Sequence, residues 1–477
     1  MSKHSLVSTQ KKLSSTRKAL YMAIAAASSL VGQVVIAGPD GGTIMGGSGN
    51  IAQSGRITTI NQLSNRVAID WKSFDVASDE RVNFIQPDAS SIALNRILSH
   101  SGSEIHGRIE ANGNIILVNP NGILFGRNST VNVGGMIASG LHIDPNDFMN
   151  GEFTLASIEG AEGKVINEGT INAAVGGSVT FVGKQVKNDG LISATLGTVN
   201  LAAGNEAVVS FDGNGLLGIK VNKAVLQNEI GLDAAVINTG EINAQGGKIL
   251  LTASISQEIF SQAVNSDGIE QAKSVLVHQD GTFTLGEGAD VVNTGHITTS
   301  SASGSAGVIA IVGENVTNSG SIQANSIGGA KGGTIELHAK DKVELRGTAT
   351  VRASANNQGD GGDIKILGNK VGLFDSAEID ASGAYGGGQI LIGGDETGNN
   401  TLVRNSDFVY VSEGSSISAD AITDGDGGKV ITFAQDTAIV HGGLSARAGT
   451  IGGNGGFVET SGLKGFELLS NPDVSSN

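Results

Sequence analysis

The sequence has no cysteine, one tryptophan, 5 prolines and only 4% aromatic residues in 477 positions. Ordinary globular cores use more aromatic residues than this and far fewer glycines than the 72 found here. No proline lies between Pro145 and Pro472, which suits a region whose backbone N–H groups are nearly all used in hydrogen-bonded ladders. These absences favour a repetitive β architecture over a set of ordinary domains.

The segment before Ala19 is basic, with Lys3, Lys11, Lys12, Arg17 and Lys18 and no acidic side chain. An apolar stretch follows from Ala19 to Ala37, and it ends in Val35-Ile36-Ala37, with small residues where signal peptidase requires them. We expect a secretory signal that is cleaved after Ala37; a retained anchor helix is the alternative. The mature chain is then expected outside the cell or on its surface, after passage through the periplasm.

Removing this signal leaves 25 Lys and Arg against 46 Asp and Glu, a formal charge of 25 − 46 = −21. Such a chain is not expected to bind nucleic acid, whose recognition needs clustered cations. The lack of cysteine in an exported chain has two explanations. Either a large stacked core needs no disulfides, or the chain crosses the outer membrane unfolded and cannot carry closed loops.

A seven-residue pattern, V-x-N-x-G-x-I, recurs five times, at Val165–Ile171, Val186–Ile192, Val236–Ile242, Val291–Ile297 and Val316–Ile322. Each copy is followed by a glycine-bounded segment in which apolar and polar residues alternate, as in a half-buried strand. These segments are Gly176–Val182, Gly197–Leu201, Gly246–Leu251, Gly307–Val312 and Gly332–Leu337. The second element is interpreted as continuing alone at Gly361–Leu367, Gly387–Ile392, Gly427–Phe433 and Gly455–Val458.

The spacing of the copies gives the length of the repeat. Val165 and Val186 open closely spaced copies, as do Val291 and Val316, whereas the wider gaps on either side of Val236 are interpreted as two coils each. A repeat of roughly 20 to 30 residues is too short for a propeller blade and fits one coil of a solenoid. We predict an all-β, right-handed parallel β-helix, in which stacked coils supply both ladder and core. The repeated Asn and Gly are expected at bends with left-handed backbone geometry, and stacked Asn side chains can hydrogen-bond along the column.

The N-terminal third lacks this repeat but contains expected strands at Arg56–Ile60, Val67–Trp71 and Ile115–Val118. We expect it to begin the helix and to cover the first coil, because an open stack exposes an unpaired edge. Trp71 is expected in the core. One segment, Ser256–Ala272, has helical composition and is expected outside the stack.

Eight sequence words between residues 40 and 160 carry a family resemblance: Asn61, Val67–Phe74, Val82–Pro87, Ile92–Ile97, Ile105–Gly107, Ala111–Gly126, Val131–Ser139 and His142–Phe148. In order, spacing and length they resemble the secretion domain of the filamentous haemagglutinin family, the exported partner in two-partner secretion. The resemblance implies a signal at 1–37, a capping secretion domain at 38–160 and a β-helical shaft at 161–477. It also implies an outer-membrane β-barrel transporter with periplasmic peptide-transport domains as partner.

The resemblance further suggests six residues for secretion or transporter recognition: Asn95, Arg96, Asn119, Pro120, Asn121 and Gly122. The last four form an Asn-Pro-Asn-Gly word after an apolar strand. Pro fixes one turn position and Asn-Gly is expected to take the left-handed ones, so the word predicts a tight turn. Whether the turn is structural alone or also contacts the transporter stays open.

Other motifs have simpler explanations than chemistry. Gly213–Gly218 matches a dinucleotide-binding G-x-G-x-x-G word, but it leads into an apparent strand at Ile219–Val221 rather than a helix. The acidic pairs Asp360/Asp363 and Asp424/Asp426 lack the tandem calcium repeats and are interpreted as solvated turns. The histidines lack metal-ligand spacing. Glycosylation sequons stand at Asn128, Asn315 and Asn399.

We therefore expect no catalytic residue, no metal and no cofactor. The function predicted first is that of a surface-exposed or released adhesin for a host receptor or glycan. The alternatives are capture of a host protein or nutrient carrier and, from another class, an enzyme acting on polysaccharide. The polar tail after Gly462 is too short to cover the last coil, so end-to-end self-association is expected unless the natural chain continues.

Overall fold

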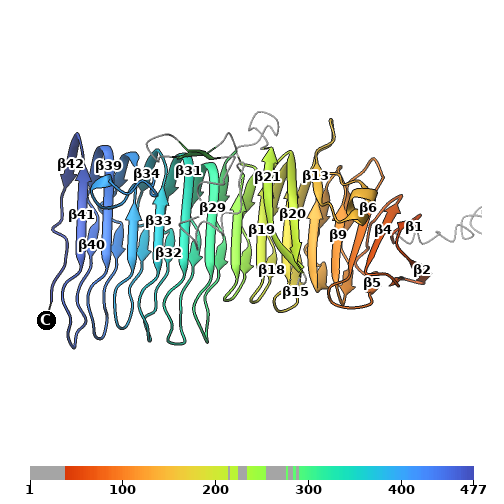
Figure 1. Ribbon diagram of the computed structural model, residues 1–477, viewed down its shortest axis with the longest axis horizontal. Coiled ribbons are helices and arrows are strands. Elements are labelled where there is room, and N and C mark those ends of the chain that lie inside the picture. Colours follow the sequence, from red (N-terminus) through yellow and green to blue (C-terminus); the bar gives the residue numbers. More distant parts are fainter. Residues whose placement is uncertain are drawn as a thin grey trace, which may run out of the picture. The chain divides into compact units, whose positions relative to one another are not determined.

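The structure is a computed structural model that describes residues 38–212, 215–223, 234–253, 275–277, 283–285 and 289–476. The predicted signal and the predicted helix at Ser256–Ala272 lie outside these residues. Each regular coil contributes three strands, for example β14 (Lys164–Asn167), β15 (Thr170–Ala173) and β16 (Ser178–Gly183). The strands of successive coils pair in parallel and in register (Figure 1). The predicted parallel β-helix is confirmed.

Three columns of strands run along the stack. The first contains β7 (Ser103–Ile105), β10 (Ile123–Phe125), β14, β17 (Gln185–Asn188), β22 (Val236–Asn238), β27 (Val291–Asn293), the second halves of β29 (Val308–Asn318) and β31 (Thr334–Leu345), β34 (Lys370–Leu373), β37 (Ser406–Val411), the second half of β39 (Lys429–Val440) and β42 (Gly465–Leu468).

The second column forms a sheet of its own with 14 strands. It contains β2 (Gly49–Ser54), β3 (Ile57–Gln62), β5 (Arg81–Ile85), β8 (Arg108–Ala111), β11 (Thr130–Val133), β15, β18 (Leu191–Ser193), β23 (Glu241–Asn243), β28 (His296–Thr298), β30 (Ser321–Gln323), β32 (Thr350–Arg352), β35 (Glu378–Asp380), β38 (Ser416–Ser418) and β40 (Gly443–Ser445).

The third column contains β1 (Thr43–Gly46), β4 (Arg66–Trp71), β6 (Ile92–Ile97), β9 (Asn114–Val118), β12 (Gly135–Ser139), β16, β19 (Thr198–Ala203), β24 (Lys248–Thr252), the first halves of β29, β31 and β39, β33 (Asp363–Leu367), β36 (Gln389–Ile392) and β41 (Phe457–Gly462). The first and third columns share one 23-stranded sheet, because β29, β31 and β39 each run through both. The strands expected at Arg56–Ile60, Val67–Trp71 and Ile115–Val118 correspond to β3, β4 and β9.

The first coil is covered as expected. β1 pairs antiparallel with β4, and β2 pairs antiparallel with β3. From β3 and β4 onward the ladders are parallel. The antiparallel strands therefore close an edge on which further parallel pairing would otherwise continue.

A single apolar column fills the inside of the coils. The Val that opens each V-x-N-x-G-x-I copy is almost fully buried in every coil, and so is the Ile that ends it. Burying one such side chain contributes about 1.5 to 3 kcal/mol, so the repeated pattern accounts for the stack. Trp71 is 1% exposed and meets Phe74 edge to face at 5.3 Å between ring centres, which confirms its place in the core.

The predicted asparagine column is confirmed in full. The side-chain amide of Asn167 donates to Asn188 at 2.8 Å, Asn188 to Asn238 at 2.8 Å, Asn238 to Asn293 at 2.8 Å, and Asn293 to Asn318 at 2.7 Å. All five side chains are buried. Each side-chain amide thus donates to the asparagine oxygen of the next coil, in the core, where an unpaired polar group would be costly.

The glycine two positions after each ladder asparagine has a different role from the one predicted. Gly190 and Gly240 do not adopt left-handed geometry. A Cβ on Gly190 would lie 2.1 Å from the carbonyl oxygen of Gly169, and one on Gly240 would lie 2.2 Å from that of Gly190. Glycine is therefore required here because stacked backbones approach closely, and the prediction of a positive φ was wrong.

Two further expectations about the repeat were wrong. Val186 pairs directly with Val236, and Val236 with Val291, so each of the two wider gaps is a single coil with an insertion. The first strand also does not stop after its fifth copy. Asn318 pairs with Leu345 and Leu345 with Leu373, so the column continues with apolar residues where the asparagine was.

The longer insertions leave the coil at one corner, between a third-column strand and the next first-column strand. They follow β12, β19, β24 and β36. After β12 come α2 (Pro145–Asn150) and β13 (Thr154–Ala156), and after β19 come β20 (Glu206–Asp212) and β21 (Gly215–Lys223). β13, β20 and β21 form a small antiparallel sheet. Strands β25 (Val275–Val277) and β26 (Phe283–Leu285) pair within the third insertion.

These insertions create apolar clusters outside the coils. Phe148 of α2 and Phe153 pack in one such cluster with outward residues of the 23-stranded sheet, called the wide sheet below, including Leu94 and Ile116. A second cluster joins Leu391, Val403 and Phe433 beneath the segment after β36, which contains the short 3-10 helix η2 (Glu396–Gly398). The wide sheet is therefore buried on both faces where insertions cross it.

Candidate functional site

Arg96 forms a buried ion pair beside the first coils. It lies on β6 directly opposite Asp70 of β4, and its Nε and Nη2 each donate to an Asp70 carboxylate oxygen at 2.7 Å. Nη1 donates to the carbonyl of Ile143 at 3.1 Å, just before α2. A two-point guanidinium–carboxylate contact of this kind fixes geometry as well as charge. Arg96 therefore ties the α2 segment to the sheet.

Asn95 points the other way, into the core. Its Oδ1 accepts the indole N–H of Trp71 at 3.0 Å, and its Nδ2 donates to the carbonyls of Ala93 at 3.2 Å and Ile116 at 3.4 Å. The side chain is fully buried. Asn95 thus satisfies the lone tryptophan, whose N–H would otherwise be buried without a partner.

The Asn119–Gly122 word forms the predicted tight turn. The Gly122 N–H donates to the Asn119 carbonyl at 2.9 Å, and the Asn119 side chain accepts the Asn121 N–H at 3.0 Å. Gly122 has a φ of +109°, whereas Asn121 does not adopt the left-handed region. The prediction of two left-handed positions was therefore wrong. Asn first, Pro second and Gly fourth is the arrangement that suits a type I turn.

This turn holds a neighbouring loop in place. Asn119 Nδ2 donates at 3.0 Å to both the Ser101 carbonyl and the Ser103 hydroxyl, and Asn121 Nδ2 donates to the Ser99 carbonyl at 2.8 Å. The turn begins directly after Val118, which is the ladder partner of Arg96. The fold therefore brings the two predicted recognition words side by side.

The buried face beside this site also affects His142. Burial lowers the pKa of His142, and the positive charge of Arg96 lowers it further. Asp144 caps α2 by accepting the Asn146 N–H at 2.7 Å. This bond and others to the first turn lower the pKa of the exposed Asp144 carboxyl. The charged Asp144 carboxyl therefore favours the docked helix, and the folded site favours the neutral form of His142.

Other sequence candidates lie apart from this site. The G-x-G-x-x-G word runs into β21, a strand, as expected. Asn128 is exposed in a turn, Asn315 donates to Asp290 at 2.7 Å, and Asn399 donates to Thr397 at 2.7 Å. Among the residues that the structure describes, no three acidic or histidine side chains gather as a metal site. No helix within the described ranges is long and apolar enough to span a membrane.

Sequence reasoning missed a hollow near the other end of the stack. Asp360, Asp363 and Asp426, interpreted as separate solvated turns, line it together with Tyr385 and Gln389. The signal was present, because a Gly-Gly pair precedes each of the strands β33, β36, β39 and β41. Aligning those pairs as neighbouring coils places the acidic residues on one face.

Comparison with known proteins identifies the family. Residues 36–299, over half of the chain, match the TPS secretion domain. The chain belongs to this family. The resemblance inferred from the sequence words is thereby confirmed, and the match extends well beyond residue 160, where the boundary stays a prediction.

The chain has relatives in Haemophilus influenzae. A heme/hemopexin-binding protein of strain Rd is 35% identical over 221 residues, which cover 44% of this chain and 24% of that protein. Another heme/hemopexin-binding protein of the species is 41% identical over 81 residues, 17% of this chain and 9% of that protein. The chain thus aligns with a quarter or less of these relatives. The crystal structure of the HMW1 secretion domain from the same species matches with a TM-score of 0.64 and 26% identity, over 92% of this chain and 98% of that one.

Proposed function

We propose that this chain is exported across the outer membrane by a dedicated β-barrel transporter with periplasmic peptide-transport domains, and that it then acts as an adhesin. The observation that carries the export step is the burial of Asn95, Arg96 and Asn119 in the folded first coils. These side chains are accessible to a transporter before the coils form. The transporter therefore recognises the chain before it folds, and folding then buries the recognised side chains and releases the chain from the transporter.

The stacked fold suits export from one end. Each coil needs only its neighbour for pairing and core, so folding can propagate coil by coil once the first coil stands. The antiparallel cap at β1 and β2 favours growth in one direction. Successive coils forming outside the cell would oppose backward sliding of the unfolded chain.

Co-expression with and without the cognate transporter tests the export step. Mature protein should appear in the medium or on the cell surface only when the transporter is present. Asn119→Ala should lower the secreted yield, whereas Asn172→Ala, which removes an exposed amide contact on β15, should not. Equal release without the transporter would refute the proposal.

The adhesin step is supported by large side chains on the outer surface of the later coils, among them Tyr385 and Phe457. Beads coated with purified protein should adhere to host epithelial cells more than beads coated with an unrelated β-helix. Equal adherence of the two would count against the adhesin.

Capture of a haem-carrying host protein is the second candidate, and the heme/hemopexin-binding relatives favour it. Immobilised protein should then retain hemopexin, with haem-loaded and haem-free hemopexin run side by side. No retention of either form would remove this candidate.

We propose binding rather than catalysis at the acidic hollow. A hydrolase acting on polysaccharide needs two carboxyl groups free to act as acid and base or nucleophile. Asp363 is instead paired with Lys331 at 2.7 Å, and Asp426 accepts the backbone N–H of Asn454 at 2.6 Å. Incubating the protein with neutral and acidic polysaccharides should release no reducing ends.

A further inference from the structure

A hollow of about 770 Å³ runs across neighbouring coils in the last third of the chain. It lies where the second column turns into the third, at the starts of β33, β36, β39 and β41. Its floor consists of stacked Gly-Gly pairs, and its walls carry Tyr385, Gln389, Phe457 and several charged side chains. It opens broadly to solvent and extends over the starts of four successive third-column strands.

The floor is bare because backbones pack directly against one another. A Cβ on Gly361 would lie 1.7 Å from the Ala381 carbonyl oxygen, and one on Gly387 would lie 1.9 Å from that of Ala419. The same close approach recurs at Gly427. No larger residue fits, so the hollow is a permanent feature of the coil geometry.

The walls offer aromatic faces and free polar groups. Tyr385 is 53% exposed and Phe457 is 46% exposed, although both are large side chains that folding usually buries. Within the described part of the chain, the Tyr385 hydroxyl, the Gln389 amide and the Asp360 carboxylate form no hydrogen bond with protein groups. These groups can therefore donate to and accept from a ligand.

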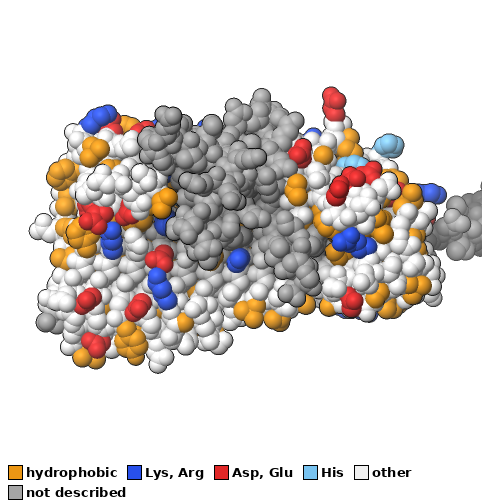
Figure 2. Space-filling model, viewed as in Figure 1, with side chains coloured by type: hydrophobic (Ala, Val, Ile, Leu, Met, Phe, Trp, Pro, Cys, Tyr) orange, Lys and Arg blue, Asp and Glu red, His pale blue; other side chains and the backbone are white. Residues whose placement is uncertain are grey.

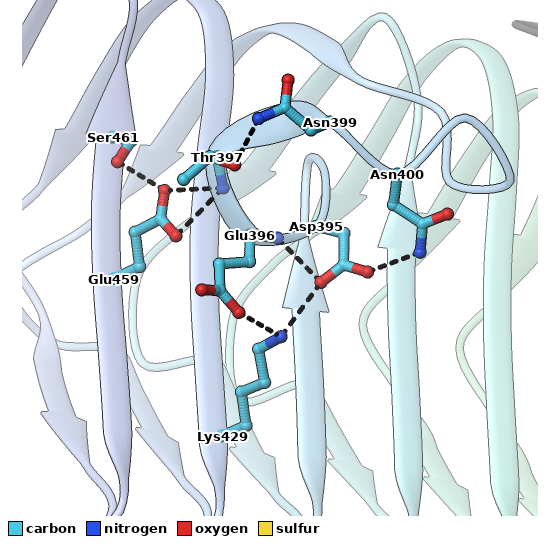
Figure 3. Close-up of polar contacts among 8 residues, drawn as sticks. All are labelled: Asp395, Glu396, Thr397, Asn399, Asn400, Lys429, Glu459 and Ser461. Atoms are coloured by element: carbon cyan, nitrogen blue, oxygen red, sulfur yellow. Dashed lines mark hydrogen bonds and ion pairs between the residues drawn. The ribbon is translucent and has the colours of Figure 1, made fainter.

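The cations of the hollow are already neutralised. Lys331 pairs with Asp363 at 2.7 Å. Lys429 is held by Asp395 at 3.3 Å and Glu396 at 3.0 Å, both from the segment that crosses the sheet after β36 (Figure 3). Asp360 and Asp426 form no ion pair among the described residues, so the hollow has net negative charge.

That crossing segment reaches past β39 and is anchored on β41, two coils beyond β36. The Thr397 N–H donates to both carboxylate oxygens of Glu459 at 3.1 Å (Figure 3). The segment also packs on the sheet through the second apolar cluster. Lys429 is thereby fixed at the edge of the hollow instead of swinging across it. A lysine tied to two carboxylates does not attract an anion.

These features select the ligand class. Net negative charge disfavours anionic polymers, and the polar floor disfavours lipids. Carboxylate, amide and hydroxyl groups beside exposed aromatic faces suit a molecule with hydroxyl groups on its edges and C–H groups on its faces. We propose that this hollow binds a neutral oligosaccharide. The inference rests on the adhesin function and gives it a receptor class.

Calorimetric titration of the exported, purified protein tests this. The probes are maltohexaose, cellohexaose and mannohexaose, with hexagalacturonate as the anionic counterpart. At least one neutral probe should bind and hexagalacturonate should not. Tyr385→Ala should weaken binding about tenfold or more, and Asp360→Asn should weaken it less. Phe408→Ala is the matched control, because it removes an exposed aromatic side chain outside the hollow, and it should change nothing.

Absence of binding by all three neutral probes would overturn the proposal, as would equal binding of hexagalacturonate. Equal loss in Tyr385→Ala and Phe408→Ala would also overturn it. Circular dichroism of each variant shows whether the coils are intact. Sugar binding without cell adherence would refute the adhesin function, and the hollow would remain an oligosaccharide-binding site. Adherence unchanged by Tyr385→Ala, with no sugar bound, would refute the hollow and leave the adhesin standing.

Discussion

Replacing Asn238 by leucine breaks two bonds of the asparagine ladder without opening a cavity. Leu345 and Leu373 already occupy the same column three and four coils further on, so leucine fits the site. Asn293 Oδ1 loses its donor, and Asn188 Nδ2 keeps only two long contacts of 3.3 Å, to Gly190 and Glu241. A buried polar group left unpaired costs about 1 to 3 kcal/mol, so about 2 to 4 kcal/mol is expected.

Asn318→Leu is the matched control at the end of the ladder. It removes one ladder bond, the 2.7 Å contact from Asn293, and the bond that Asn318 itself donates to the Gly320 carbonyl at 3.2 Å. The Asn293 amide keeps a contact to Gly295 at 3.4 Å. We expect a cost of about 1 to 2 kcal/mol. Hydrogen exchange of peptides covering 236–243 and 291–298 measures the local opening free energy, because repeat arrays need not unfold in two states. Equal loss of protection in the two variants would refute the ladder argument.

Further predictions concern the first coils, one buried carboxylate and the last coil. Asp70→Asn should leave Arg96 buried without its counter-charge and destabilise the N-terminal coils by about 3 to 5 kcal/mol in urea unfolding followed by tryptophan fluorescence; an unchanged midpoint would contradict this. Burial by itself would raise the pKa of Glu336, but His338 and Lys365 outweigh it and lower that pKa from 4.5 to about 2. The contribution of Glu336 to stability should therefore be complete above pH 4.5 and lost as the pH falls through about 2. In acid unfolding, the Glu336→Gln variant should therefore lose less stability over this range than the parent protein does. Phe466→Glu should abolish concentration-dependent association in small-angle scattering, and association that persists in this variant would exclude the last coil as the contact.

That last prediction follows from a change along one inward column. Val371, Val409 and Ala438 are buried, whereas Phe466, next in register, is 63% exposed. Hydrophobic side chains are visible over the β39–β42 end in Figure 2. An apolar surface next to unpaired strand edges favours pairing with a second chain.

The sequence was sufficient to predict the coil, because the spacing of the seven-residue words follows directly from the packing of one coil on the next. Val165 and Val186 had to be equivalent once both opened the same seven-residue word, and in-register stacking followed. The same reasoning failed where one word was missing. Between Val186 and Val236 the sequence does not say whether the additional residues form a coil or leave it, since both contain strands of similar composition.

Side-chain direction was the second limit. Asn95 and Arg96 are adjacent in a sequence word that resembles the family. Asn95 nevertheless faces the core, whereas Arg96 forms an ion pair on the opposite face of β6. Asp360 and Asp426 are far apart in the sequence, and they line the same hollow because the Gly-Gly pairs of successive coils stack in one column. Local patterns predict the strand, but neighbours across the ladder decide what a polar side chain meets.

The corner where insertions leave the coil has a consequence for how such proteins change in length. At β29, β31 and β39 the chain passes this corner without interruption, and after β12, β19, β24 and β36 it departs and returns with the ladder intact. Duplication or grafting of foreign segments should therefore be tolerated at this corner, where the ends of an excursion are already held together by the adjacent coils. The Asn119–Gly122 turn lies at the same corner, but its amides bind the preceding loop. Length variation should accumulate in the later coils while the first ones stay constant.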